Sequence, residues 1–179
     1  PHVTESGVKI MSMHLLLPNA TDPVLWRGPV ISGVVKQFWE DVQWGDVDFL
    51  FVDMPPGTGD VPLTVFQSLP INGILIVSTP QSLVSMIVDK AMNMAQMMQV
   101  PVLGMVENMR FLRCPDCGKE IPLFGSDDHV DNHTVPVLER IPLDPTVAAA
   151  CDAGKLEQAE IDYLAKTAVM LTETFGKKQ

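Results

Sequence analysis

Short apolar runs alternate with longer segments of helical periodicity along most of the chain. This alternation is typical of βαβ units, in which helices connect parallel strands. The predicted strands are residues 8–13, 49–54, 73–78, 102–106 and 135–140, and the predicted helices are residues 30–42, 62–69, 82–98, 145–150 and 160–175. We therefore expect an α/β fold, a mostly parallel sheet flanked by helices in three layers.

The apolar run at residues 49–52 suits a strand that is buried on both faces. It ends at Asp53 and breaks into a loop rich in proline and glycine that runs to Asp60. Ligands of α/β proteins bind where such strands end, so Asp53 could hold Mg²⁺ through water. Gly57 and Gly59 would let backbone N–H groups approach a phosphate. The alternative is a tight turn that Asp53 merely caps.

Composition narrows the class of protein. The chain has 179 residues, the size of one domain spanning residues 1–179, and 46% of them are hydrophobic. Its net charge of -10, with 12 Lys and Arg, argues against a nucleic-acid partner. No apolar run approaches the roughly 20 residues that cross a bilayer, and the N-terminus lacks a signal pattern. We expect no membrane partner and a cytoplasmic location.

Residues 108–132 interrupt the alternation and read as an irregular insertion, which in a compact domain is usually functional or disordered. Within it, Cys114 and Cys117 are separated by Pro115 and Asp116 and followed by Gly118. Proline and glycine favour a tight knuckle that aims both sulfurs at one point. Two thiolates make only half of a tetrahedral metal or cluster site.

The other half of the site has two candidate sources. His129 and His133 would complete a spacing close to that of a zinc finger. A second copy of the chain would instead bring two more thiolates across a two-fold axis, which suits a 4Fe-4S cluster or zinc. A redox dithiol, or cysteines without metal, remain open. Cys151 reads as a small core residue.

Five segments, taken in order, resemble the Mrp-type iron-sulfur cluster carriers, which belong to the deviant-Walker P-loop class with MinD, ParA and the nitrogenase iron protein. They are residues 26–29, 53–60, 107–109, 114–117 and 140–145. The resemblance covers nearly the whole chain. It implies a P-loop NTPase-like fold and a homodimer that shares a labile 4Fe-4S cluster through Cys114 and Cys117. Apo iron-sulfur proteins would accept that cluster.

The resemblance also implies roles for the nucleotide-facing residues. Asp53 would match the Walker B aspartate, and the switch II loop would run from Pro55 to Asp60. Asp53 and Asp60 are the catalytic candidates. Asn108 would read the adenine edge. The expected nucleotide contacts are Pro55, Gly57, Thr58, Gly59, Asn108, Pro142 and Asp144, the last two in a loop that would border the base.

The chain departs from this family at one point. It contains no G-x-x-x-x-G-K phosphate loop, and it begins at Pro1. It therefore resembles the C-terminal two-thirds of a longer protein, with the N-terminal βα portion missing. We expect the full-length protein to bind and hydrolyse ATP with Mg²⁺, and this chain alone to be inactive. The alternatives are a MinD- or ParA-like positioning ATPase and a zinc-stabilised interaction protein with a vestigial nucleotide loop.

Overall fold

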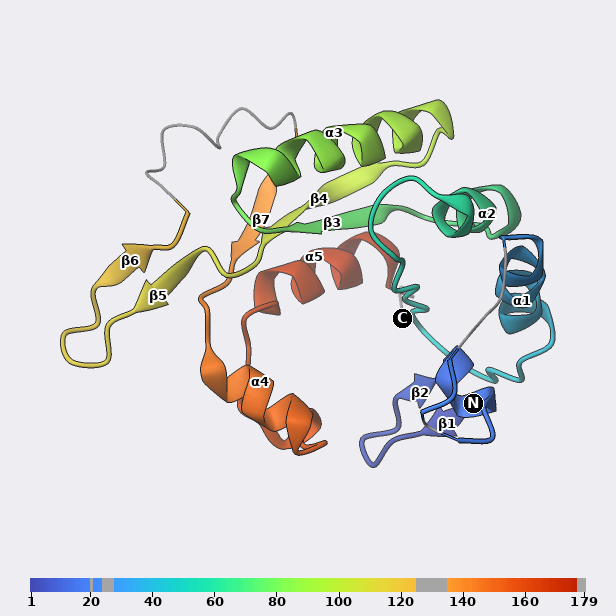
Figure 1. The fold of residues 1–179 in the computed structure, drawn as a ribbon, viewed down its shortest axis with the longest axis horizontal. Coiled ribbons are helices and arrows are strands. Elements are labelled where there is room, and N and C mark those ends of the chain that lie inside the picture. The colour runs from blue at the N-terminus through green and yellow to red at the C-terminus, as the bar shows by residue number, and fades with distance from the viewer. Residues whose placement is uncertain (20, 24–27, 125–134, 177–179) are drawn as a thin grey trace. The chain divides into compact units, whose positions relative to one another are not determined.

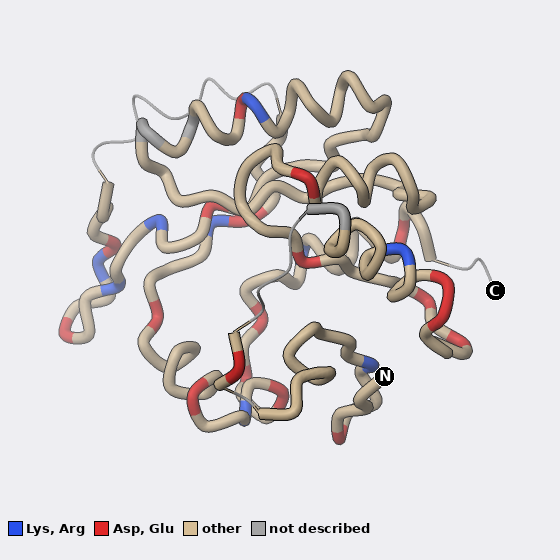
Figure 2. Tube along the Cα trace, turned by 45° about the vertical axis from the view of Figure 1, so that its right-hand side comes forward, with Lys and Arg blue, Asp and Glu red and all other residues tan. Residues whose placement is uncertain are grey.

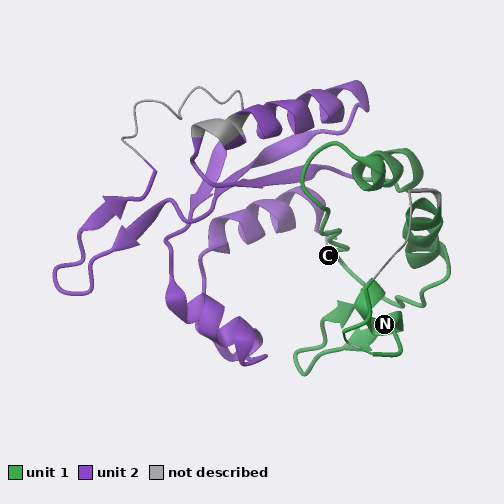
Figure 3. Cartoon of the chain, in the orientation of Figure 1, with its two compact units in different colours: residues 1–71 green, residues 72–179 purple. Residues whose placement is uncertain are grey.

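The computed structural model describes residues 1–19, 21–23, 28–124 and 135–176. The chain divides into two compact units, Pro1–Ile71 and Asn72–Gln179 (Figure 3). The single-domain interpretation stays a prediction. His129 and His133, and the first two residues of the segment 26–29, lie outside the described residues. None of the helices in the described residues combines the length and the apolar character that a membrane span requires.

A parallel sheet forms the centre of the second unit. Its strand order is β3-β4-β7, with β3 at Ile74–Ser78, β4 at Val102–Glu107 and β7 at Val137–Arg140. Helix α3 (Ser82–Met97) runs along one side of this sheet and α5 (Ala165–Phe175) along the other (Figure 1). The expected α/β fold with a parallel sheet between helices is confirmed.

The core of this unit sits between α3 and the sheet. Ile76 of β3, Val88 of α3 and Met105 of β4 are all buried and form one cluster, against which Val84 and Met92 of α3 also pack. β4 is the middle strand, and its last four residues are all buried. Burial on both faces explains why β4 reads as a nearly continuous apolar run.

The pairing register brings three strand ends to one edge of the sheet. Ser78 pairs with Glu107, and Glu107 pairs with Arg140. Because the strands are parallel, each loop that leaves this edge starts beside the others. It is the edge at which α/β proteins bind ligands.

The expected irregular insertion is partly regular. It contains an antiparallel hairpin of β5 (Phe111–Arg113) and β6 (Glu120–Pro122), with both cysteines of the C-x-x-C pair in the connection. Strands of three residues are too short to show a period of two in the sequence. After β7 come α4 (Pro145–Asp152) and the 3₁₀ helix η3 (Leu156–Gln158).

The first unit is built mainly from two helices. These are α1 (Gly28–Glu40) and α2 (Asp60–Ser68), which are joined by a 2.8 Å hydrogen bond between the Ser32 and Thr64 hydroxyls. A two-stranded ribbon of β1 (His2–Val3) and β2 (Lys9–Ile10) precedes the 3₁₀ helix η1 (Met13–Leu16). The predicted strand at residues 8–13 is thus cut to two residues.

The prediction of a buried strand at residues 49–54 is wrong for this structure. The segment has no strand assignment, and Phe51 is 70% exposed. An apolar run becomes a strand only where a neighbouring strand supplies its hydrogen bonds. Within the described part of the first unit, the only strand pairing is between β1 and β2.

The last helix begins later than its periodicity predicts. It starts at Ala165 rather than at residue 160, and Glu139 of β7 explains the difference. One Glu139 carboxylate oxygen accepts hydrogen bonds from the backbone N–H groups of Lys166 and Thr167, at 2.8 and 3.2 Å. A carboxylate at the N-terminus of a helix pairs with N–H groups that have no partner within the helix. Its negative charge also interacts favourably with the positive end of the helix dipole.

Close packing in the sheet makes Gly104 of β4 intolerant of a side chain. A Cβ at this position would lie 2.5 Å from Leu138 Cγ. We expect Gly104→Ala to lower the free energy of unfolding by about 1–3 kcal/mol, the usual range for overpacking. Urea titration followed by circular dichroism measures the change.

Gly33→Ala is the matched control, because Gly33 lies in α1 with open space around it. Alanine should raise helix stability there by about 0.5–1 kcal/mol. Equal effects of the two substitutions would contradict the packing argument.

Candidate functional site

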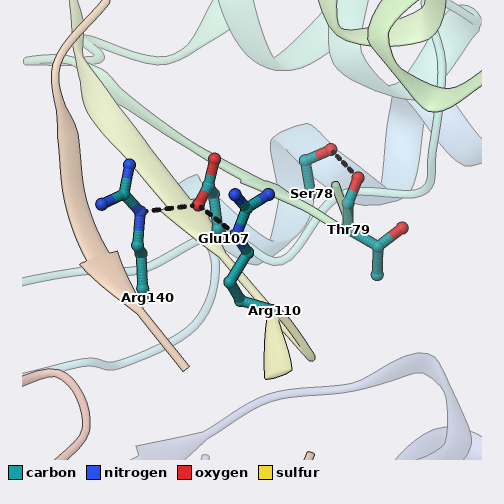
Figure 4. A network of polar contacts seen from close by, with 5 residues as sticks. All are labelled: Ser78, Thr79, Glu107, Arg110 and Arg140. Carbon is teal, nitrogen blue, oxygen red and sulfur yellow. Dashed lines mark hydrogen bonds and ion pairs between the residues drawn. The ribbon is translucent and has the colours of Figure 1, made fainter. Parts of the chain in front are cut away.

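A cluster of charged side chains, centred on a buried glutamate, lies at the carboxyl edge of the sheet (Figure 4). The Glu107 side chain is 2% exposed, and its Oε2 accepts a 3.0 Å hydrogen bond from Arg140 Nε. Arg110 Nε lies 3.7 Å from the same oxygen, and the Arg110 side chain is 7% exposed. The cluster therefore joins the ends of β4 and β7 to the turn that follows β4.

The turn after β4 holds Asn108, the predicted reader of the adenine edge. Asn108 N–H donates to Ser78 O at 2.7 Å, which fixes the turn to the end of β3. The next residue, Met109, has a φ of 52°, unusual for a residue with a side chain. Met109 N–H donates to Asn108 Oδ1 at 3.0 Å, which supports this conformation locally.

The loop of residues 141–144, which is predicted to border the base, lies against this turn. Ile141 N–H donates to Glu107 O, and Arg110 N–H donates to Ile141 O, both at 2.8 Å. Leu143 N–H donates to Phe111 O at 2.8 Å. Pro142 is buried. The structure thus brings Asn108 together with the loop that carries Pro142 and Asp144.

Asp144 already has protein donors on both carboxylate oxygens. Oδ1 accepts from Thr146 N at 2.8 Å and from Thr146 Oγ1 at 2.7 Å, so Asp144 caps α4. Oδ2 accepts from the Tyr163 hydroxyl at 2.6 Å. These bonds, that of Tyr163 above all, lower the pKa of Asp144, and the same contact raises the pKa of Tyr163. No local pattern in the sequence indicates this role of Tyr163, which lies 19 residues from its partner.

Cys114 and Cys117 meet in the knuckle that their spacing predicts. Gly118 N–H donates to Cys114 O, and Cys114 N–H donates to Lys119 O, each at 2.9 Å. Gly118 has a φ of +71°, which a side chain would disfavour, so glycine suits this turn. β5 and β6 hold the knuckle from both sides.

The knuckle favours a thiolate at Cys114. Hydrogen bonds from the backbone N–H groups of Cys117 and Asp116, and from the Cys117 thiol, lower the pKa of Cys114. The thiolate is the form that binds metal. In the described residues, no three His, Cys, Asp or Glu side chains gather around a common point. Within those residues the pair therefore supplies two ligands. The expectation of a buried Cys151 is wrong, because that residue is exposed at the end of α4.

Charges of both signs surround the knuckle. Figure 2 shows acidic and basic positions close together on the hairpin. Arg113 Nη2 lies 3.2 Å from Glu120 Oε1 across the two strands, and the Arg113 guanidinium lies 5.8 Å from the centre of the Phe111 ring. The pair is more than half exposed, so it contributes little to stability.

The predicted phosphate-facing loop lies in the first unit. Asp53, Pro55, Thr58 and Gly59 are exposed, and Gly57 has a φ of +87°. Asp60 is the first residue of α2 and Gly59 is its N-cap. An acidic side chain there also stabilises the helix. The two predicted halves of the nucleotide site thus belong to different units.

Comparisons with known proteins agree with the resemblance. The family model for the NUBPL iron-transfer P-loop NTPases matches residues 1–174. A protein of Clostridium perfringens named iron-sulfur cluster carrier protein is 44% identical over 161 residues, 88% of this chain and 56% of the relative. A protein of the same name from Methanocaldococcus jannaschii is 44% identical over 158 residues, 86% of this chain and 54% of the relative.

A solved structure shares the fold. The nucleotide-binding protein of Archaeoglobus fulgidus, in complex with ADP, is 38% identical with a TM-score of 0.76, over 91% of this chain and 64% of that one. The chain spans about half the length of the curated relatives that it matches. Together with the strand-end loops and the cysteine knuckle, these matches show that the chain belongs to the family of NUBPL-type iron-transfer P-loop NTPases, the iron-sulfur cluster carriers.

Proposed function

We propose that the protein carries a 4Fe-4S cluster between two copies of the chain, each of which contributes Cys114 and Cys117. The observation that carries the proposal is the knuckle, in which backbone N–H groups favour a thiolate at Cys114. Four thiolates from two such knuckles suit a 4Fe-4S cluster, and they would also suit zinc. The name that the curated relatives share supports the cluster as cargo.

The nucleotide half of the proposal concerns the full-length protein. It binds and hydrolyses ATP, and hydrolysis drives cluster binding or transfer. The ADP in the Archaeoglobus relative supports a nucleotide ligand. The loop at residues 141–144, held against Asn108, supports a base site. Asp53, an exposed carboxylate, would hold Mg²⁺ through water, and Asp60 would act beside it.

Coupling between the two halves follows the order of elements. The γ-phosphate would order the loop between Pro55 and Asp60, and hydrolysis would release it. Helix α2 starts at Asp60 and would carry the change to the dimer interface. Apo iron-sulfur proteins would receive the cluster. We propose that the protein is located in the cytoplasm.

A positioning ATPase of the MinD or ParA type is the less favoured function. Such a protein has no need of two soft ligands on one turn. A zinc-stabilised interaction protein would use the same cysteines, and metal analysis separates it from the carrier.

The lowered pKa of Cys114 predicts thiolate chemistry at unusually low pH. Alkylation of Cys114 by iodoacetamide should rise at a lower pH in the folded chain than in the same chain unfolded in urea, because only the fold supplies the N–H donors. Peptide mass spectrometry across a pH series measures this.

Cys117→Ala should move the pH profile of Cys114 alkylation in the folded chain only part of the way toward that of the unfolded chain. The variant loses the Cys117 thiol donor, but both backbone N–H donors remain. Identical profiles for the folded and unfolded chains would contradict the proposed thiolate.

The shared cluster predicts the outcome of reconstitution. Anaerobic addition of iron and sulfide should give a brown dimer with about four irons per pair of chains. Cys114→Ala should abolish both the iron content and the cluster-dependent dimer, whereas Cys151→Ala, at an exposed cysteine outside the knuckle, should change neither.

Iron content and mass by light scattering are the measurements. A cluster retained by Cys114→Ala would refute the shared site. Zinc bound in place of iron would favour the interaction protein.

The proposed link between nucleotide and cluster predicts that one substitution in the full-length protein lowers both ATP turnover and cluster transfer. Asp53→Asn should reduce ATP turnover at least about 100-fold, because the Mg²⁺ contact is lost. Transfer to an apo-acceptor should slow with it. Phosphate release and acceptor absorbance measure the two rates, with Asp41→Asn, an exposed carboxylate outside the site, as the control. Unchanged transfer beside abolished turnover would rule out the coupling.

A further inference from the structure

We propose that Glu107 is a positioning residue for nucleotide-base recognition: its buried carboxylate, held by Arg140 and Arg110, sets the Asn108 turn against the loop of residues 141–144. The inference rests on the proposed function, because it concerns the base of the same nucleotide. It adds a residue that makes no contact with the ligand and acts through Asn108.

The position of Glu107 in the sheet supports this role. It is the last residue of the middle strand and pairs with Ser78 on one side and Arg140 on the other. Asn108 follows it directly, and the loop of residues 141–144 follows Arg140 directly. The bond from Arg140 Nε to Glu107 Oε2, at 3.0 Å, therefore ties together the starting points of both base-facing segments.

Backbone bonds repeat the same connection. Ile141 N–H donates to Glu107 O, and Arg110 N–H donates to Ile141 O. The side-chain contacts of Arg110 and Arg140 thus add two charged links to a junction that is already hydrogen-bonded (Figure 4). These contacts hold the turn at Glu107 and at Arg110, on both sides of Asn108. The backbone from which the Asn108 side chain extends is therefore fixed in position.

The cluster is a costly way to join two strands. Glu107 Oε1 is buried and has no hydrogen-bond partner among the described residues. An apolar residue would join the strands without burying a charge. The Arg140 side chain is half exposed, so its pair with the buried Glu107 contributes little net stability. Met109, two residues after Glu107, has a positive φ of 52°, which is strained for a residue with a side chain. Strain and unsatisfied groups of this kind concentrate at functional sites, which favours a role in geometry over one in stability.

The chemistry of the amide explains why geometry matters at Asn108. An amide can donate to a ring nitrogen of adenine while it accepts from the 6-amino group. Asn108 Oδ1 already accepts from Met109 N–H, which leaves one acceptor position and both N–H donors. Guanine presents an oxygen where adenine has the amino group. A turn that is free to shift would therefore lose the distinction between the two bases.

The test uses the full-length protein and the ratio of two affinities. Glu107→Gln keeps the shape and removes the charge that holds both arginines. The dissociation constants for ATP and GTP, measured by calorimetry, should differ strongly in the natural protein. In the variant the preference for ATP should fall about tenfold, mostly through weaker ATP binding. A loss of stability alone would weaken both nucleotides together and leave the ratio unchanged.

Glu120→Gln is the matched control, because it makes the same change in the exposed pair with Arg113. It should leave the ratio as it is. Circular dichroism checks that each variant is folded. If Glu107→Gln does not fold, Arg140→Gln tests the same link at a side chain that is half exposed, with the same expected fall.

The outcomes separate the inference from the proposed function. A natural protein that binds neither nucleotide refutes the nucleotide half of the proposed function and the inference with it. A natural protein that prefers ATP, with a folded Glu107→Gln variant of equal preference, refutes only the inference. Equal binding of ATP and GTP by the natural protein also refutes only the inference.

Discussion

Parallel pairing of β3, β4 and β7 sets the position of every loop at the candidate site in the second unit. The register places Ser78, Glu107 and Arg140 side by side, so the three chain segments that leave the sheet start from neighbouring points. Asn108 is held to β3, residue 141 is held to β4, and the cysteine hairpin grows from the same turn. A shift of one residue in this register would separate all of these contacts at once.

The sequence pattern was sufficient for the elements that bury an apolar surface. β3, β4, β7 and α3 lie close to their predicted ranges, because each contributes a continuous or periodic apolar face to one core. Residues 49–52 show the limit of this reasoning. Their apolar side chains suit a buried strand, but strand formation depends on a neighbour that the local sequence does not specify. The start of α5 likewise depends on Glu139, 27 residues before Lys166.

The sequence predicts those parts of the candidate site whose residues are close together along the chain. It does not predict contacts between residues that are far apart in the sequence. Cys114 and Cys117 lie on one tight turn with Gly118, so their spacing alone indicated a knuckle. The bond between Tyr163 and Asp144 joins residues that no local pattern connects. Glu107 left a signal that could have been used: like Asp53, it is an acidic residue that ends an apolar run. An acidic residue in that place is either paired or functional, and here it is paired with two arginines.

The hairpin has a consequence for how the protein would respond to its own abundance. In the proposed shared site each chain presents only the two thiolates of Cys114 and Cys117, so the cluster would be held by a pair of chains. Loading would then depend on the square of the monomer concentration, and dilution alone would favour release. The amount of cluster that is carried would therefore rise more steeply than the amount of the protein.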